Sequence, residues 1–251
     1  MIQQGDIILE SRNLRRDFGG VQALRGVDLK VRRGSITGLI GPNGSGKTTF
    51  FQVVSGMDPD GTGEVIFDHQ QILGLRPSKI YGRGLARTFQ LSRVFPELTV
   101  LENLMVAGHR GDKGNQERAL GLLQKVDLHN YADIYGSDLS YGQQRLVEFL
   151  RVLMSDPALI LLDEPAAGVN PTMRNILWDL VRHINGLGTT ILIIEHNMNV
   201  IAELCEEVYV LNEGELIAHG DFAAIRNDET VLEAYFGRTR VQSPTPGRVS
   251  P

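Results

Sequence analysis

The residues with the clearest chemical potential form one stretch, Gly41-Pro42-Asn43-Gly44-Ser45-Gly46-Lys47-Thr48-Thr49. Its pattern, G-x-x-x-x-G-K-[ST], lets successive backbone N–H groups point into one concavity that can hold phosphate oxygens. An apolar run precedes the stretch and a helix-like run follows it, as a phosphate loop requires. In this setting Lys47 would reach the β- and γ-phosphates and the Thr48 hydroxyl would bind Mg²⁺. A glycine-rich turn that fits by chance is the alternative, but the flanking elements favour a nucleotide site.

Two carboxylates follow a second apolar run, Leu159–Leu162. Four apolar residues and then Asp163 are typical of a central strand that ends at the nucleotide. Asp163 would hold Mg²⁺, directly or through water, and Glu164 would polarise the attacking water as general base. A strand ending in two solvated carboxylates is the other interpretation, and the phosphate loop argues against it.

A third stretch, Leu139-Ser140-Tyr141-Gly142-Gln143-Gln144-Arg145, places a serine and a glycine at a predicted helix start. The N–H groups of a first helical turn can bind an anion. No nearby element of this chain needs such a site, because the phosphate loop already supplies one. From the residues alone, a simple serine N-cap is therefore the preferred interpretation of Ser140.

The elements that must position these residues follow from periodicity. The N-terminal part predicts an antiparallel layer, with strands at 7–14, 21–24, 27–31 and 64–67. A strand at 85–90, ending in Gln90, precedes helices at 100–107, 116–126 and 141–154 that form an inserted all-helical subdomain. Its inward-facing residues are predicted to be Leu120, Leu122, Leu123, Val126 and Leu128.

The α/β pattern resumes at residue 158, so the fold class is α/β. Strands are predicted at 158–163, 189–194, 208–211 and 216–219, and helices at 171–184, 197–204, 221–226 and 230–236. Residues 1–237 are expected to form one domain, with a core at about 1–90 and 156–220, a helical subdomain at about 91–155 and C-terminal helices at about 221–237. The tail, 238–251, lacks core-forming residues and is expected to be disordered.

Composition limits the partners of the chain. It has 251 residues, a net charge of −5 and no basic block, which argues against a nucleic-acid partner. Its single cysteine, Cys205, excludes an internal disulfide and suits a reducing compartment. We see no signal peptide and no run near the ~20 apolar residues of a membrane span. If the protein works at a membrane, we expect it to dock on another protein that spans it.

The stretch at Leu139–Arg145 resembles the LSGGQ signature of the ATP-binding-cassette (ABC) family, and the other family motifs occur in the right order. Asp17-Phe18 is similar to the adenine-stacking position, and Gln90 to the Q-loop glutamine that senses Mg²⁺ and water. Ala167-Gly168-Val169-Asn170 resembles the D-loop, and His196 the switch histidine that contacts the γ-phosphate. The resemblance covers residues 7–237 and implies a P-loop NTPase (RecA-like) core.

The resemblance also implies how the site works. The cofactors would be ATP and Mg²⁺, with Glu164, His196 and Gln90 as catalytic residues and Thr48, Gln90 and Asp163 at the metal. Two cassettes of the family pack head to tail, as a homo- or heterodimer, and each signature caps the γ-phosphate held by the other chain. The residues facing that partner would be Leu139, Ser140, Tyr141, Gly142 and Gln143.

Three positions depart from the family pattern without removing a catalytic group. Tyr141 replaces the first signature glycine, which should leave the donors of Ser140 and Gly142 in place. Asn170 replaces the usual D-loop aspartate, which could soften coupling across a dimer, and Phe18 replaces the commoner tyrosine.

Several strings are similar to LivG-type subunits of branched-chain (hydrophobic) amino-acid importers, among them 84–90, 139–145, 164–171 and 226–237. This resemblance implies transmembrane permease subunits as partners, a solute-binding protein as an indirect partner, and a place on the cytoplasmic face of the inner membrane. Val94, Phe95 and Leu98 would form part of the permease-docking groove, or would be buried in the helical subdomain.

Other members of the family remain as alternatives. They are transporters for urea, short amides or lipopolysaccharide, a cassette ATPase of DNA repair or translation that is not a transporter, and a cassette that binds ATP but barely hydrolyses it. Glu164 and His196 argue against the last of these. The absence of a coiled coil, a zinc module and a second cassette argues against the repair and translation types.

Overall fold

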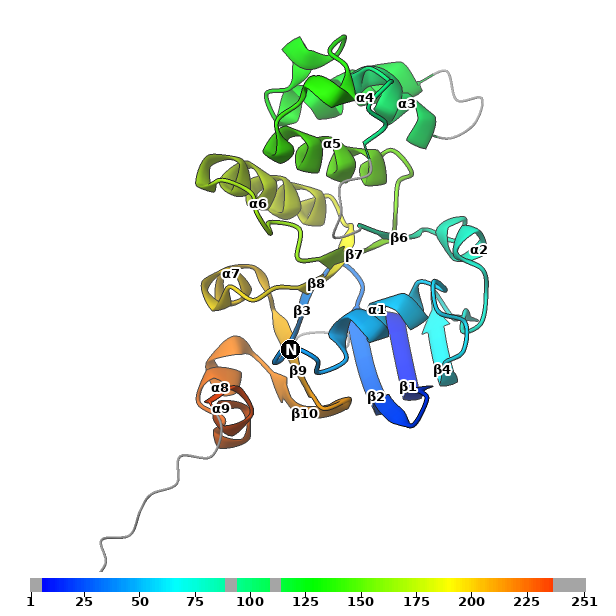
Figure 1. Cartoon of the computed structure of the whole chain (residues 1–251), viewed down its shortest axis with the longest axis vertical. Helices are drawn as coiled ribbons and strands as arrows, with labels where there is room; N and C mark the ends of the chain where they lie inside the picture. The colour runs from blue at the N-terminus through cyan, green and yellow to red at the C-terminus, as the bar shows by residue number, and fades with distance from the viewer. Residues whose placement is uncertain (1–5, 89–93, 109–113, 237–251) are drawn as a thin grey trace, which may run out of the picture.

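The computed structural model describes residues 6–88, 94–108 and 114–236, and its α/β fold has three layers (Figure 1). The helices α3–α5 lie at one end, the larger sheet crosses the middle, and α1 with the smaller sheet lies at the other end. The strands are β1 Ile7–Phe18, β2 Val21–Arg32, β3 Ile36–Ile40, β4 Thr62–Phe67, β5 Gln70–Gln71, β6 Leu85–Arg87, β7 Leu159–Asp163, β8 Thr190–Ile194, β9 Glu207–Asn212 and β10 Glu215–Gly220. The helices are α1 Lys47–Val54, α2 Pro77–Tyr81, α3 Val100–Ala107, α4 Asn115–Lys125, η1 His129–Tyr131, η2 Gly136–Asp138, α5 Tyr141–Leu153, α6 Pro171–Gly186, α7 Met198–Leu204, α8 Phe222–Arg226 and α9 Glu229–Phe236.

The larger sheet has the strand order β10-β9-β3-β8-β7-β6, parallel except for β10. Its inner strands read as continuous apolar runs because both faces are covered. In β7, Leu159 and Leu161 pack toward α1 and the small sheet, whereas Ile160 and Leu162 pack toward α5–α7. Because side chains alternate along a strand, the single apolar run of β7 contributes to two hydrophobic cores, one on each face of the sheet.

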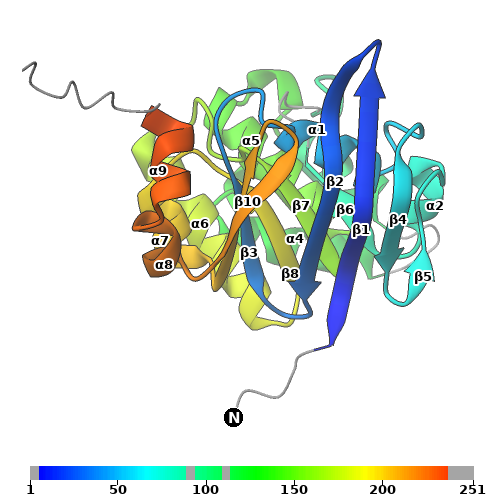
Figure 2. The same cartoon turned by 90° about the horizontal axis from the view of Figure 1, so that it is seen from below.

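The smaller sheet has the order β2-β1-β4-β5 and is antiparallel, so the predicted N-terminal layer is confirmed. The predicted strands at 21–24 and 27–31 form a single strand, β2, whose pairing with β1 shifts register at several points. Helix α1 fills the space between the two sheets, and its Phe50 and Phe51 are fully buried there. Figure 2 shows β4, β5 and α2 on one side of the β1–β2 hairpin, with α7, α8 and α9 gathered on the far side of the molecule.

The helical region contains α3, α4 and α5, and one expectation about its packing is wrong. Leu123, Val126 and Leu128 are buried, and Leu122 is half-buried, but Leu120 is 39% exposed. Helix α4 turns Ala119 and Leu123, four residues apart, toward the core. Leu120 lies about 100° further round the helix and therefore faces out.

The remaining differences concern short elements. Helix α2, which begins with Pro77, was not predicted from its five residues. Strand β6 ends at Arg87, and Gln90 lies outside the described residues, as does the tail 238–251. Trp178 is buried in the core, and Cys205 packs at its margin. Among the described residues, no helix is both long and apolar enough to cross a membrane.

Candidate nucleotide-binding site

The phosphate loop leaves the carboxyl end of β3 and ends where α1 begins. Gly41 has φ +150°, and a Cβ there would lie 1.9 Å from the carbonyl oxygen of Leu211. Gly46 has φ +106°, and a Cβ there would lie 2.5 Å from the carbonyl oxygen of Ala23. Both positions need glycine because neighbouring backbone approaches them and because their conformation disfavours side chains. The glycines of the pattern are therefore required by the packing of the loop.

Lys47 is buried inside its own loop. Its Nζ donates to the carbonyl oxygens of Gly41 at 2.8 Å and Pro42 at 2.9 Å, and to Ser45 Oγ at 3.4 Å. Burial lowers the pKa of Lys47, and the carboxylates of Glu164 and Asp163 oppose that shift. Among the described residues, the hydrogen-bond acceptors of this ammonium are neutral oxygens. It can exchange them for charged phosphate oxygens, which form stronger hydrogen bonds.

The start of α1 is prepared for an anion. Its N-cap is Gly46, which has no side chain to occupy the free N–H groups of the first turn. These groups and the helix dipole favour a bound negative charge. Thr48 and Thr49 lie half-buried in the same turn, and Asn43 and Gly44 lie exposed at the tip of the loop.

Asp163 ends β7 and is almost completely buried. Arg87, on the neighbouring strand β6, donates to Asp163 Oδ2 at 2.9 Å. Oδ1 has no hydrogen-bond partner among the described residues, and burial raises the pKa of the carboxyl group despite Arg87. A buried carboxylate oxygen together with the Thr48 hydroxyl fits Mg²⁺, which takes one or two protein oxygens and completes its shell with phosphate and water.

Glu164 and His196 come together from the ends of adjacent strands, β7 and β8. Glu164 Oε1 lies 2.7 Å from His196 Nε2, and the Glu164 N–H donates to the carbonyl oxygen of Ile194 at 3.0 Å. Glu164 has φ +47°, a left-handed conformation that costs a residue with a side chain on the order of 1–3 kcal/mol. That conformation turns the chain sharply after β7 and presents the carboxylate beside the histidine.

Two charged residues of this site were not predicted from the sequence. One is Arg87, the partner of Asp163. The other is Glu195, a buried residue whose Oε2 accepts the His196 N–H at 3.2 Å, and burial raises its pKa. In the sequence, each of these residues is a charged residue at the end of an apolar strand or directly after it. The same pattern is typical of a strand that ends in solvent, so it does not by itself indicate a functional site.

Phe18 lies at the end of β1, in the hairpin beside the loop. It is 45% exposed, and the Arg16 guanidinium lies 4.2 Å from its ring centre. The same hairpin supplies Ala23, whose carbonyl oxygen borders Gly46. The structure thus brings an exposed aromatic ring to the neighbourhood of the phosphate loop. Gln90 falls outside the described residues.

The signature residues lie at the start of α5, away from the phosphate loop in sequence and capped by their own side chains. Ser140 Oγ accepts the Gln143 N–H at 3.4 Å, and Gln143 Oε1 accepts the Ser140 N–H at 2.9 Å. Ser140 is therefore a helix cap, as the residues alone suggested. Leu139 is buried below it.

The second half of the signature packs on the D-loop of the same chain. The Tyr141 hydroxyl donates to the carbonyl oxygen of Ala167 at 3.3 Å, and its ring borders Gly168. A Cβ at Gly142 would meet Met173 at 3.1 Å. Tyr141 thus fills the space between the two motifs.

The D-loop residues, Ala167 to Asn170, connect Glu164 to α6. Asn170 is the N-cap of this helix, and its Oδ1 accepts the Met173 N–H at 3.0 Å. Val169 is half-buried and its N–H donates to the carbonyl oxygen of Ala166. Asparagine and aspartate cap helices about equally well, so the local fold tolerates asparagine where the family usually has aspartate.

A groove of about 430 Å³ lies beside α3 and α5. Phe95 lines it, is 43% exposed and stacks on the Arg151 guanidinium at 4.6 Å. Val94 and Leu98 are half-buried. The three apolar residues are therefore divided between the surface of the groove and the interior of the helical region.

Comparisons with known proteins agree on the class of site. Residues 24–167 match the family described as ABC transporter, and residues 215–240 match the family described as branched-chain amino acid ATP-binding cassette transporter. The high-affinity branched-chain amino acid transport ATP-binding proteins BraF of Pseudomonas aeruginosa and LivG of Escherichia coli are each 36% identical over 249 residues, covering 92% of this chain and 98% of theirs.

Solved structures give the same result. A nucleotide-free ATP-binding cassette from an ABC transporter has a TM-score of 0.84 and 33% identity, covering 93% of this chain and 100% of that one. A dimeric structure of a bacterial ABC transporter cassette has a TM-score of 0.75 and 26% identity, covering 85% and 98%.

Proposed function

Because the chain belongs to the ABC transporter family, we propose that its ATPase activity powers an importer of branched-chain or other hydrophobic amino acids. The observation that supports this substrate class is the match of residues 215–240 to the branched-chain amino acid cassette family. That segment lies outside residues 24–167, which match the family described simply as ABC transporter. It therefore supports this substrate class over urea, short amides or lipopolysaccharide.

In this proposal the phosphate loop and α1 hold the nucleotide. Lys47 leaves the carbonyl oxygens of its loop and donates to the β- and γ-phosphates. Phe18 supports the adenine ring by stacking. Thr48, Asp163 and Gln90 would hold Mg²⁺, which would supply positive charge to neutralise the negative charge that develops on the phosphates.

Hydrolysis depends on the pair formed by Glu164 and His196. Glu164 accepts a proton from the attacking water as the water bonds to the γ-phosphorus and the bond to the β-phosphate oxygen breaks. The 2.7 Å contact with His196 Nε2 orients the Glu164 carboxylate. His196 in turn has its main chain held by Glu195.

The working unit would be a pair of cassettes. The start of α5 contacts the D-loop of its own chain through Tyr141, and the solved dimeric structure of a bacterial cassette supports the pairing of two cassettes. On closure, the residues Leu139–Gln143 would face the γ-phosphate of the partner, and ATP would shift the population toward the closed pair.

The groove beside Phe95 supports a membrane partner. An exposed aromatic ring stacked on a guanidinium offers both an apolar and a polar contact to a segment of a permease. The proposed location is the cytoplasmic face of the inner membrane, reached through the permease. A solute-binding protein would act on the opposite side.

The test is reconstitution of this chain with the permease subunits encoded beside it, in liposomes, with the matching binding protein. We expect ATP-dependent uptake of leucine, isoleucine and valine, and an ATPase rate that rises when the binding protein carries leucine. Uptake of urea or acetamide instead would replace the substrate class. An ATPase stimulated by DNA or ribosomes, with no permease copurifying, would refute the transport function.

A further inference from the structure

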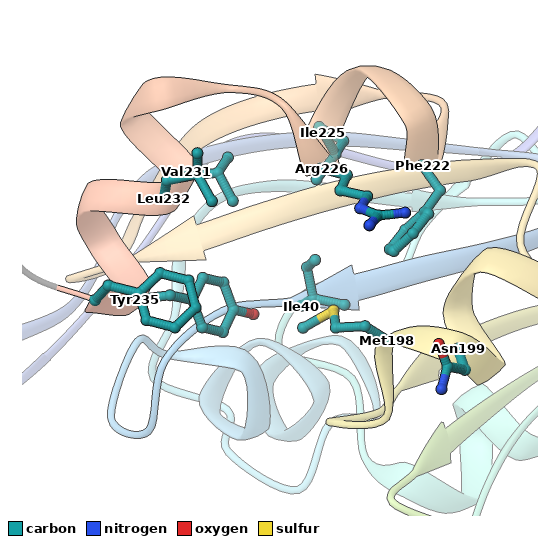
Figure 3. A pocket seen from close by; sticks show the side chains of 10 residues that line it. Ile40, Met198, Asn199, Phe222, Ile225, Arg226, Val231, Leu232 and Tyr235 are labelled. Carbon is teal, nitrogen blue, oxygen red and sulfur yellow. The ribbon is translucent and has the colours of Figure 1, made fainter.

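A pocket of about 420 Å³ separates the C-terminal helices from the nucleotide core (Figure 3). Helices α8 and α9 form one wall and the last residue of β3 with the first turn of α7 forms the other. Its size is in the range of small-molecule sites, about 300–1,000 Å³. Neither the phosphate loop nor the catalytic pair lines it. The residues that line it include Ile40, Met198, Asn199, Arg226, Val231 and Leu232.

The lining is amphipathic along its length. Figure 3 shows the Arg226 guanidinium and the Asn199 amide toward one end, and Val231 and Leu232 toward the other. No ion pair of Arg226 is found among the described residues. Leu232 is 43% exposed, so part of the apolar wall remains accessible.

These groups define a ligand. A guanidinium recognises a carboxylate with two parallel hydrogen bonds. The Asn199 carbonyl can accept from an ammonium, and the wall of Ile40, Val231 and Leu232 favours a branched aliphatic chain by burial. We propose that this pocket binds a branched aliphatic α-amino acid and that its occupation regulates the ATPase.

The walls explain how occupation would reach the site. Ile40 immediately precedes Gly41, the first residue of the phosphate loop, and Met198 follows His196 by two residues. Figure 3 shows the Tyr235 hydroxyl directed toward the end of β3. Burial raises the pKa of Tyr235 to about 12, so its hydroxyl stays neutral there. A ligand seated here touches the supports of both the loop and the histidine.

This regulation rests on the proposed function, because the ligand class is that of the transported solute. High cytoplasmic solute would then slow its own import. None of the residues proposed to hold ATP lines the pocket, so Arg226, an exposed lining residue, can be changed without altering them.

The experiment titrates the purified full chain with L-leucine by calorimetry, up to about 10 mM, and follows ATP hydrolysis over the same range. We expect saturable binding of leucine. The rate of ATP hydrolysis should fall over the same range of leucine concentration. Isovalerate, which keeps the carboxylate, should bind more weakly, and isoamylamine, which lacks it, should not bind.

The variant Arg226→Gln should weaken leucine binding by about 10–100-fold, as loss of a charged hydrogen-bond partner predicts, and should keep the ATPase rate without leucine. Arg76→Gln, at an exposed position directly before α2 and outside the pocket, is the control and should bind leucine normally. Absence of binding, or equal binding by Arg226→Gln, would overturn the site.

Reconstituted transport separates the two proposals. If Arg226→Gln still drives leucine uptake but escapes inhibition by leucine inside the liposomes, both stand. If uptake of leucine fails in the wild type while the pocket still binds it, the substrate class is wrong and the pocket is not. If uptake succeeds and inside leucine has no effect, the regulatory role is wrong.

Discussion

Two helices of this chain begin in a turn suited to phosphate, and their starts are built in opposite ways. Helix α1 follows Gly46, which has no side chain, so its first N–H groups remain available to a ligand. Helix α5 follows Ser140, and a capping box with Gln143 satisfies its first turn internally. The first turn of α1 is therefore free of side-chain caps and open to a ligand, whereas the first turn of α5 is capped by side chains of its own chain.

The surroundings of the two starts differ as well. Beside α1 lie Lys47 and the ends of β7 and β8, with Asp163, Glu164 and His196. On α5 itself two buried charged residues, Arg145 and Glu148, form an ion pair at 3.0 Å. We therefore expect the residues at the start of α1 to determine the affinity for nucleotide. The residues at the start of α5 should affect activity only when two chains form a dimer. The following changes test that division, from the largest effect to the smallest.

Glu164→Gln should have the largest effect and only on the chemical step. Loss of a general base costs about 10²–10⁴-fold in rate, whereas Lys47 and the open start of α1 still hold the phosphates. Phosphate release measures the rate, and light scattering after size exclusion should show a dimer accumulating with ATP. Glu117→Gln, an exposed carboxylate on α4, is the control. Normal hydrolysis by Glu164→Gln would show that another group is the base.

Lys47→Ala should act on binding itself. Removing a charged donor from phosphate oxygens should raise the Kd for ADP by about 10–100-fold, measured by fluorescence titration. Lys79→Ala, on the exposed part of α2, is the matched control. Equal affinity in Lys47→Ala and wild type would contradict the assignment of the open start to nucleotide affinity.

The sequence predicts the chemistry of the α1 start better than that of its surroundings. Gly41 and Gly46 follow a local rule, because the backbone conformation they need is set within the loop. The pairing of Arg87 with Asp163 follows from the neighbouring positions of β6 and β7, and no local pattern reveals which strands are neighbours. The burial of Glu195 could not be predicted from the sequence for the same reason, because it depends on the packing of α6 and α7 over β8.

Side-chain direction on helices shows the same limit. The apolar run of α4 made Leu120 look like a core residue, but the face that packs inward is fixed by α3 and α5. Ser140 was ambiguous between a cap and a ligand donor, and the structure shows the cap of a single chain. The role of Ser140 toward a partner stays a prediction.

Ser140→Ala separates those two roles of the α5 start. Loss of the cap should cost about 0.5–2 kcal/mol of stability, and ADP affinity should not change. Because we propose that the signature completes the site of a partner chain, we expect hydrolysis to fall. Ser140→Asn is the matched variant, because asparagine keeps the cap. If Ser140→Asn restores stability and hydrolysis together, the hydroxyl has no separate part in the dimer.

Glu195→Gln should have the smallest effect, and it concerns the ionisable groups around the α1 start. Burial raises the pKa of Glu195 above its ordinary value of 4.5, so the folded protein holds this proton more firmly than the unfolded chain. That contribution to stability is complete below the ordinary pKa and is lost as pH rises through the raised value. Glutamine has no proton to lose, so the variant should gain in Tm relative to the wild type as the pH rises from the ordinary pKa of 4.5 towards neutral. Thermal melts across that range measure the offset, and an offset that shrinks with rising pH would mean that the carboxylate is better satisfied as an ion. The α1 start would then be surrounded by stabilised charges, like the Arg145–Glu148 pair on α5, and the contrast between the two helix starts would rest on capping alone.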